Sequence, residues 1–190
     1  MAEVPQATAV ERLGLIPKLG FALAAAFKHF LLYPLTGDSE TGLFRFVVYS
    51  AIRKLLSTIT VAQEQSTIKP TTVVYRAVAK ELHFEPAIER LPSGLQVCWF
   101  GPRTAQKTVI FFHGGGYVLG ASAGHLKWAH VLQQSLNKAG HDVNVAVPCY
   151  TLAPRGQYPA QLTEAVDFLN WILNDKGRNP GDVWLPDHYS

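Results

Sequence analysis

A chain of 190 residues with 48% hydrophobic residues is long and apolar enough to bury a core, which excludes wholesale disorder. The length favours one domain, with room for a small appendage. The formal net charge of +3 is small and the basic residues are scattered, so the sequence indicates no nucleic-acid partner. Cys98 and Cys149 lack the spacing of metal ligands and lie in or beside strand-like runs. We expect both to be buried free thiols in a reducing compartment.

Residues 15–35 form the most apolar stretch, and their spacing predicts an amphipathic helix. Its longest uncharged core, Leu19–Phe27, is nine residues, well short of the roughly 20 that a membrane span requires. Lys18, Lys28 and His29 lie opposite the apolar face, and no clean cleavage site follows, so a signal peptide is not expected either. We expect the apolar face to pack against the body of the protein, with contact to a membrane surface as the alternative. That face consists of Leu15, Leu19, Leu23, Phe27, Phe30 and Leu31.

Three segments follow before the pattern changes. A second amphipathic helix is expected over residues 41–57, after a polar stretch that interrupts the first. Residues 58–69 have the composition of a linker. Residues 70–82 are ambiguous, since their first half favours a strand and their second half a helix, and we predict a short helix there.

From residue 84 onward the pattern is that of strands alternating with helices, which predicts an α/β fold. Continuous apolar runs without polar alternation are typical of strands buried on both faces of a sheet. The expected elements are an antiparallel pair at 84–91 and 95–100, a buried strand at 108–112, a helix at 122–138, a buried strand at 143–147 and a helix at 158–173. The last helix is expected to bury Leu162, Ala165, Val166, Leu169, Ile172 and Leu173.

The strand at 108–112 runs directly into His113 and three consecutive glycines, Gly114–Gly116. Without Cβ atoms this turn can adopt positive φ and bring its N–H groups close to another atom. A helix begins near Ser122, so the turn lies at the carboxyl edge of the sheet, where anions and oxyanions bind. A dinucleotide needs G-x-G-x-x-G, but Leu119 occupies the third glycine position. The oxyanion of acyl transfer is the stronger candidate ligand, and a turn that needs glycine only for its conformation is the remaining interpretation.

Two motifs resemble the hormone-sensitive-lipase-like esterases of the α/β-hydrolase fold. The first is His113–Tyr117, which resembles the HGGG-type turn after the third strand of that fold. The second is Tyr150–Pro154 followed by Tyr158–Ala160, which resembles the Tyr-x-Leu-Ala-Pro and Phe-Pro-Ala segment after the fourth strand. Arg155 stands where an acidic residue is usual, and the second part begins with tyrosine instead of phenylalanine. The resemblance extends over about residues 84–173.

This resemblance implies a fold and an activity. Residues 70–190 would form the N-terminal half of an α/β-hydrolase sheet, and residues 1–69 would be a cap-like helical segment. The complete protein would be a cytoplasmic serine esterase acting on small or medium apolar carboxylic esters, with no cofactor and no metal. Peripheral contact with a membrane through residues 15–35 stays open as an alternative.

The resemblance also assigns roles to the residues of the glycine turn. Gly114 and Gly115 would donate N–H bonds to the tetrahedral oxyanion, and Gly116 would give the turn its conformational freedom. His113 would brace the loop.

The nucleophile of that family lies on a G-x-S-x-G turn between the fifth strand and the next helix. Residues 174–190 resemble only the loop that leads to the fifth strand, so we expect the chain to be truncated before the nucleophile and inactive alone. Gly120–Gly124 matches G-x-S-x-G, but no strand runs directly into it. We therefore predict that Ser122 is the N-cap of the following helix.

A sheet cut before its fifth strand would leave the strand at 143–147 with an unpaired edge and exposed apolar surface, which favours self-association. The alternative to an esterase is a non-catalytic remnant or binding module that keeps the start of the fold.

Overall fold

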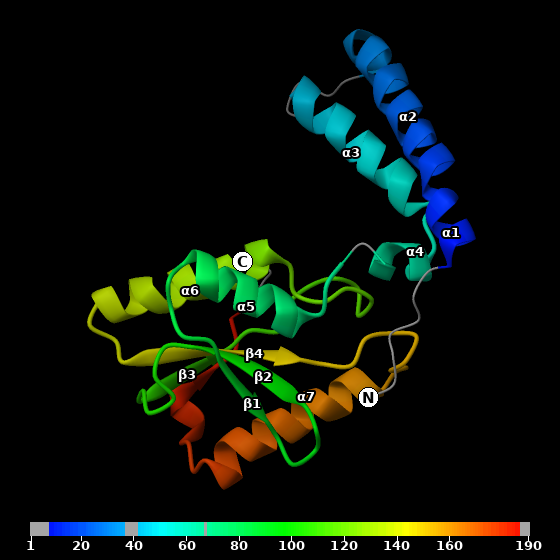
Figure 1. Cartoon of the computed structure of the whole chain (residues 1–190). Helices are drawn as coiled ribbons and strands as arrows, with labels where there is room; N and C mark the ends of the chain where they lie inside the picture. The colour runs from blue at the N-terminus through cyan, green and yellow to red at the C-terminus, as the bar shows by residue number, and fades with distance from the viewer. Residues whose placement is uncertain (1–7, 37–41, 67, 187–190) are drawn as a thin grey trace. The chain divides into compact units, whose positions relative to one another are not determined.

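The computed structural model describes residues 8–36, 42–66 and 68–186, and the chain divides into two compact units. The helical unit is Met1–Thr67 and the sheet unit is Ile68–Ser190. Figure 1 shows the helical unit in blue and cyan, and the sheet unit from green to red.

The described part of the helical unit forms α1 (Ala9–Leu13), α2 (Leu15–Thr36), α3 (Leu43–Leu56) and α4 (Val61–Ser66). α2 and α3 lie side by side, and they confirm the two amphipathic helices expected from the sequence (Figure 1). The linker predicted at residues 58–69 is wrong in part, because α4 lies within it. Reciprocal bonds between Thr60 and Gln63 favour this short helix, with each side-chain oxygen accepting from the backbone N–H of the other residue (3.3 and 3.1 Å).

α2 contacts α3 through the side that the sequence assigns to its polar face. Ala22 is buried on that side, and the rings of His29 and Tyr33 pack on Phe46 at centroid distances of 5.3 and 5.5 Å. Lys18 is partly buried because its Nζ donates to Oε1 of Gln63 (2.7 Å). The leucine and phenylalanine face therefore makes no contact with α3, and its packing against the body of the protein stays a prediction. The side chains left 49–71% exposed are Leu19, Leu23, Phe27, Phe30 and Leu31.

The sheet unit holds a five-stranded mixed sheet in the order β1-β2-β4-β3-β5. β1 pairs antiparallel with β2 and β2 with β4, whereas β3 runs parallel to both β4 and β5. The predicted α/β fold and the antiparallel pair are confirmed. The strands are β1 (Ala87–Arg90), β2 (Gln96–Phe100), β3 (Lys107–Ile110), β4 (Val143–Cys149) and β5 (Val183–Trp184).

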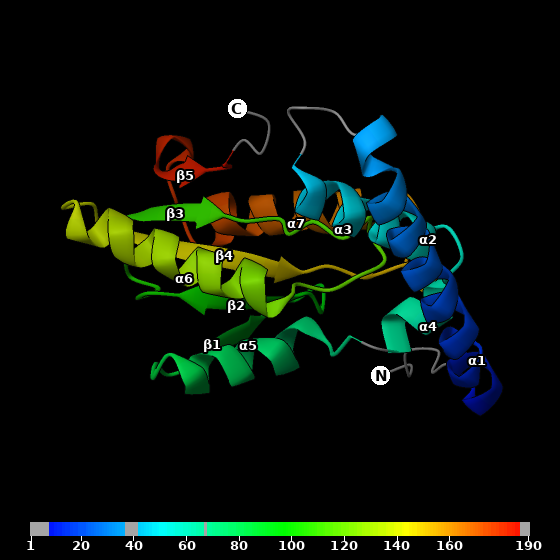
Figure 2. The ribbon, with the colours of Figure 1, turned by 90° about the horizontal axis from the view of Figure 1, so that it is seen from above.

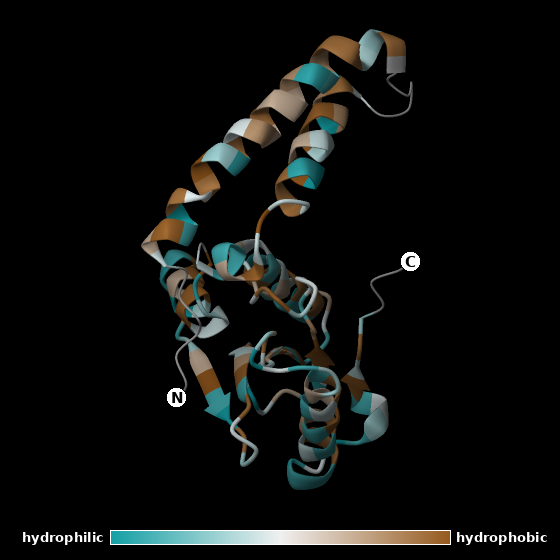
Figure 3. Ribbon diagram, turned by 90° about the vertical axis from the view of Figure 1, so that its right-hand side faces the viewer, coloured by the Kyte–Doolittle hydropathy of each residue, from teal (hydrophilic) through white to brown (hydrophobic). Residues whose placement is uncertain are grey.

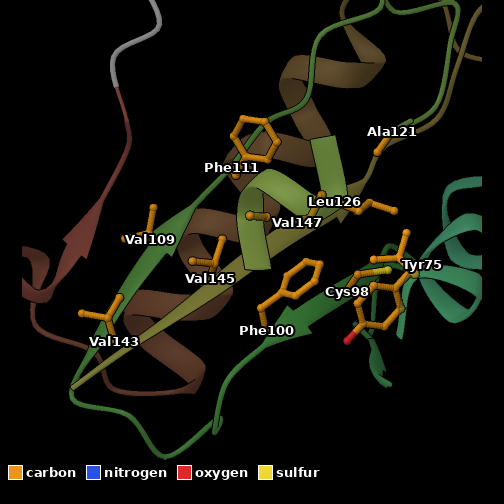
Figure 4. Packing of buried hydrophobic residues seen from close by; sticks show 12 residues of the cluster. Tyr75, Cys98, Phe100, Val109, Phe111, Ala121, Leu126, Val143, Val145 and Val147 are labelled. Atoms are coloured by element: carbon orange, nitrogen blue, oxygen red, sulfur yellow. The ribbon is translucent and has the colours of Figure 1, made fainter. Parts of the chain in front are cut away.

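Helices cover both faces of this sheet, and successive strand residues point to opposite faces (Figures 1 and 2). α5 (Thr71–Glu81) and α6 (Ala123–Lys138) cover one face, and α7 (Ala160–Asn170) covers the other. Figure 4 shows the first face, where Tyr75 of α5 and Leu126 of α6 pack on strand residues. The helix predicted at 70–82 is confirmed as α5.

The buried face of α7 differs from the predicted one. Leu162 and Val166 are 54% and 48% exposed, whereas Phe168 is fully buried. Gln161 explains this rotation, because its Nε2 donates to two carbonyl oxygens, those of Thr151 (2.9 Å) and Gly156 (2.8 Å). A polar amide on the buried side of a helix is absent from the pattern of apolar residues, so that pattern does not indicate which side is buried. A π-helical turn, Trp171–Asp175, and a short 3₁₀ helix, Pro180–Asp182, follow.

The end of the described chain corrects the expectation of a sheet cut before its fifth strand. Val183 and Trp184 form β5 and pair in parallel with Thr108 and Val109 of β3. β4 has a neighbour on each side, so the unpaired edge predicted at residues 143–147 is wrong.

The two cysteines face one another across β2 and β4. Cys98 is buried and Cys149 is partly buried, and both are free, with their Sγ atoms 3.6 Å apart. The hydrogen bond with the Cys149 thiol, together with burial, raises the pKa of the Cys98 thiol, so it stays protonated.

Tyr75 joins α5 to the two antiparallel strands. Its ring is fully buried and packs edge-on against Phe100 at 5.1 Å. Its hydroxyl donates to the carbonyl of Trp99 and accepts the N–H of Ala87 (3.1 Å). Burial raises the pKa of Tyr75 to about 12, which keeps the hydroxyl available as a donor.

Tyr75→Phe keeps the ring but removes the hydroxyl, and it leaves a buried carbonyl without its partner. We expect it to lower the free energy of unfolding of the sheet unit by about 1–3 kcal/mol, measured by urea denaturation followed by tryptophan fluorescence. Tyr158→Phe is the matched control, because Tyr158 is 83% exposed. Equal stability of the two variants would show that the Tyr75 hydroxyl does not hold these elements together.

Candidate active site

The loop after β3 adopts the turn that the three glycines predict. The N–H of Phe111 still pairs with the carbonyl of Ala146 on β4 (2.8 Å). The backbone then passes through positive φ at Gly115 (127°), Gly116 (59°) and Tyr117 (60°). The loop therefore reverses direction at the carboxyl ends of the parallel strands.

The backbone requires glycine at position 115 but not at position 114. A Cβ on Gly115 would lie 2.8 Å from the carbonyl oxygen of Leu119, so conformation and packing both exclude another residue. A Cβ on Gly114 would meet nothing within 4 Å, and the φ of Gly114 is not in the left-handed region. The folded chain itself does not need glycine at 114. Its open side leaves room for a molecule that approaches the backbone closely.

The backbone N–H groups of Gly114, Gly115 and Gly116 donate no hydrogen bond to any group in the described residues. All three residues are exposed, so water can solvate these donors and they carry no burial cost. Successive free N–H groups on such a turn form an anion-binding set.

His113 lies beneath the glycines and is braced by Tyr150. His113 is 4% exposed, and the two rings stack at a centroid distance of 4.4 Å. The Tyr150 hydroxyl donates to the carbonyl of His113 (2.6 Å), and burial raises the pKa of Tyr150 to about 12. Nδ1–H of His113 donates to the carbonyl of Gly114 (2.9 Å). Burial, with a smaller contribution from His125, lowers the pKa of His113, so the imidazole is neutral at pH 7.

The two sequence motifs meet in space. Besides the contact of Tyr150 with His113, the N–H of Ala153 donates to the carbonyl of Tyr117 (2.8 Å). In the sequence, the second motif only supports the resemblance, and it does not predict Tyr150 as a brace. The signal that could have found Tyr150 is its position directly after β4, the parallel neighbour of β3.

Ser122 is the N-cap of α6, as the sequence predicts. Its Oγ accepts the N–H of His125 (3.3 Å), and its own N–H donates to Nδ1 of His125 (3.2 Å). This reciprocal bonding occupies Ser122 in capping. Residues Gly120–Gly124 are thus the start of a helix and not a turn between strand and helix.

The described residues contain no group of three or more histidine, cysteine, aspartate or glutamate side chains that could hold a metal ion.

Comparison with known proteins gives a partial match to a sequence family and a similar fold. A sequence family described as alpha/beta hydrolase fold matches residues 109–185. The 3-O-acetylpapaveroxine carboxylesterases CXE2 and CXE1 of Papaver somniferum are 37% and 36% identical over 83 residues. These alignments cover 42% of this chain and only 25% of each relative. The crystal structure of an esterase E25 matches 66% of this chain and 39% of its own, with 18% identity and a TM-score of 0.50, which supports the fold alone.

Two substitutions in the glycine loop should distinguish the position that needs glycine for its conformation from the position that has open space beside it. Gly115→Ala forces an alanine into positive φ and against the Leu119 carbonyl, so we expect a loss of about 1–3 kcal/mol in the free energy of unfolding. Gly114→Ala should change it by no more than about 0.5 kcal/mol, since the new methyl group meets nothing. Urea denaturation measures both, and an equal loss in the two variants would contradict the difference.

His113 should make stability depend on pH. Its folded-state pKa lies below its unfolded value, so its contribution to stability is present above about pH 6.5 and is lost as pH falls towards the folded pKa. We expect the free energy of unfolding to fall between about pH 7 and about pH 5, and His113→Asn to reduce that fall. His141→Asn, at an exposed position, is the control and should retain the wild-type slope. An unchanged slope in His113→Asn would rule out His113 as the source.

Proposed function

We propose that this chain carries the oxyanion-binding part of a carboxylic-ester hydrolase, because residues 109–185 match the alpha/beta hydrolase fold family and the two similar poppy proteins are named carboxylesterases. Its N–H groups would accept the negative charge that develops on the ester carbonyl oxygen when a nucleophile attacks. The chain covers 25% of the curated relatives it matches, so the activity of the whole protein is part of this proposal.

The observation that carries the proposal is the set of unused donors at Gly114, Gly115 and Gly116. The brace from Tyr150 to His113 fixes the base of the loop, so the donors would need little rearrangement when charge develops. Removal of one such donor in an esterase-type site costs about 10²- to 10³-fold in rate.

We assign to the loop residues the roles that the resemblance implies. Gly114 and Gly115 would donate to the oxyanion, and Gly116 would let the turn form at positive φ. His113 would position the loop without acting as a base, because its ring is 4% exposed and its unprotonated Nε2 is buried away from the open side of the loop. The substrate would be a small or medium apolar ester. The two poppy relatives are named for an O-acetyl ester, which supports a small acyl group.

A binding module without turnover is the second candidate function. The observation in its favour is that Ser122, which lies in the G-x-S-x-G match, caps α6. Among the described residues, no serine lies on a turn that a strand enters and a helix leaves. The chain would then bind an anionic or carbonyl oxygen through the same loop but would not cleave the ester.

An oxyanion mimic tests the binding step directly. We expect an alkylphosphonate monoester, which carries a tetrahedral anionic oxygen, to shift the amide NMR signals of Gly114–Gly116 in a saturable manner. Gly114→Ala should weaken this binding, because its methyl group fills the open side of the loop. Gly181→Ala is the control, since a Cβ there also meets nothing within 4 Å. If the loop signals do not shift, or if Gly114→Ala binds as tightly as the wild type, the loop is not an oxyanion site.

The same preparation separates binding from turnover. We expect the chain to hydrolyse p-nitrophenyl butyrate no faster than buffer with matched free imidazole, and Ser122→Ala to leave that rate unchanged. Saturable turnover that Ser122→Ala abolishes would show that Ser122 is a nucleophile and not only a cap.

A further inference from the structure

The helical unit presents a large apolar surface that its own helices do not cover. Figure 3 shows hydrophobic residues spread along both α2 and α3. Surfaces of this kind on a soluble chain mark a contact with another protein or with a membrane. The exposed side chains include Ile16, Leu19, Leu23, Phe27, Phe30, Leu31 and Leu35 of α2, and Phe44, Tyr49, Ile52 and Leu56 of α3.

Contact between the two helices does not explain this surface. α2 packs on α3 through His29 and Tyr33, and Ala22 is buried on the same side of the helix, which is a different side from that of Leu23 and Phe27. Leu23 is 71% exposed and Phe27 is 64% exposed. Exposure of these side chains to water is unfavourable, so contact with another apolar surface would stabilise the helical unit.

The charge of the same two helices indicates which kind of apolar surface they fit. α2 and α3 contain five lysine and arginine residues, Lys18, Lys28, Arg45, Arg53 and Lys54, and neither helix contains an acidic residue. Lys18 is bound to Gln63, whereas the other four are exposed and take part in none of the ion pairs between described residues. Anionic lipid headgroups attract such cations, each by an amount that is useful for binding.

We propose that α2 and α3 bind the surface of an anionic phospholipid bilayer, with their exposed leucine and phenylalanine side chains in the acyl boundary and their cations among the headgroups. A second copy of the chain fits this surface less well, because it would bring two uniformly cationic helix pairs together. The proposal concerns the helical unit only and does not depend on the proposed esterase activity.

A transmembrane span is the other membrane-bound state. Among the described residues, Ala9–Leu35 is long and apolar enough to cross a bilayer by length and composition. Lys28, however, lies within the second half of α2, and Pro34 lies inside the helix near its end. A charge at that depth is costly in a span but is well placed in a helix that lies at the headgroup level.

Vesicle flotation tests the proposal with the full chain. In a density gradient, bound protein rises with the vesicles, whereas aggregated protein does not. We expect the chain to float with phosphatidylcholine vesicles that contain phosphatidylserine, and much less with phosphatidylcholine alone. Higher salt should reduce the difference between the two, because it screens the headgroup charge.

Two double variants separate the apolar and electrostatic parts. Leu23→Asp with Phe27→Asp should abolish flotation on either vesicle. Val131→Asp with Leu162→Asp is its control, because both positions are exposed apolar sites of the sheet unit (59% and 54%). This control should float as the wild type does.

The second double variant reverses two positive charges of α3. Arg53→Glu with Lys54→Glu should lower the apparent partition coefficient on anionic vesicles by at least about tenfold, with no comparable change on neutral ones. The control is Arg76→Glu with Lys80→Glu on exposed positions of α5, which should behave as the wild type. Far-UV circular dichroism of each variant checks that its helices form.

Several outcomes would overturn the proposal. Absence of flotation, equal flotation on neutral and anionic vesicles, or wild-type flotation of Leu23→Asp with Phe27→Asp would each do so. Resistance to carbonate extraction from vesicles would indicate a span in place of surface binding. A dimer that does not float, and that Leu23→Asp with Phe27→Asp converts to a monomer, would identify a second copy as the occupant.

Discussion

The parallel pairing of β3 with β4 is the constraint on which the candidate site depends. Val109 pairs with Val145 and Ile110 with Ala146, so the two strands run in the same direction and end at the same edge. Their carboxyl ends release the glycine loop and Tyr150 side by side, although His113 and Tyr150 are far apart in the sequence. An antiparallel pair could not place these two segments together at one edge.

The pairing also explains how a loop of glycines can hold a fixed shape. Glycine loses more conformational entropy on ordering than any other residue, so the loop needs anchors on its flanks. The Tyr150 hydroxyl holds the His113 carbonyl, the Ala153 N–H holds the Tyr117 carbonyl, and Oγ1 of Thr71 accepts the Ala121 N–H (2.9 Å). Anchors at the start, middle and end order the loop and leave the glycine donors between them unused. Donors ordered in advance are what oxyanion stabilisation requires.

The sequence predicts the elements whose signal is local, and it misses those that depend on tertiary contacts. The longer helices α2, α3, α5, α6 and α7, the buried strands, the glycine turn and the Ser122 cap follow from periodicity and composition, whereas the short helices α1 and α4 do not. β5 does not, because a two-residue strand has no period and exists only by pairing with β3. The side by which α2 packs on α3 and the rotated face of α7 were missed because His29 and Tyr33 of α2 and Gln161 of α7, which make the contacts, are not strong apolar signals. In the site, the position of the loop is predictable, but the Tyr150 brace is not.

The two units are stabilised by different physical means. The sheet unit has clusters of buried residues on both faces of its sheet, so its core is closed by α5 and α6 on one side and α7 on the other. In the helical unit, Ala22 is the only hydrophobic residue among the described ones that is buried. Helices as apolar as α2 are normally held by burial of a face, since helix propensity alone contributes little. The apolar residues of this unit therefore form a surface that its own helices leave exposed, and the exposed cations beside them are the reason that we propose an anionic bilayer as its partner.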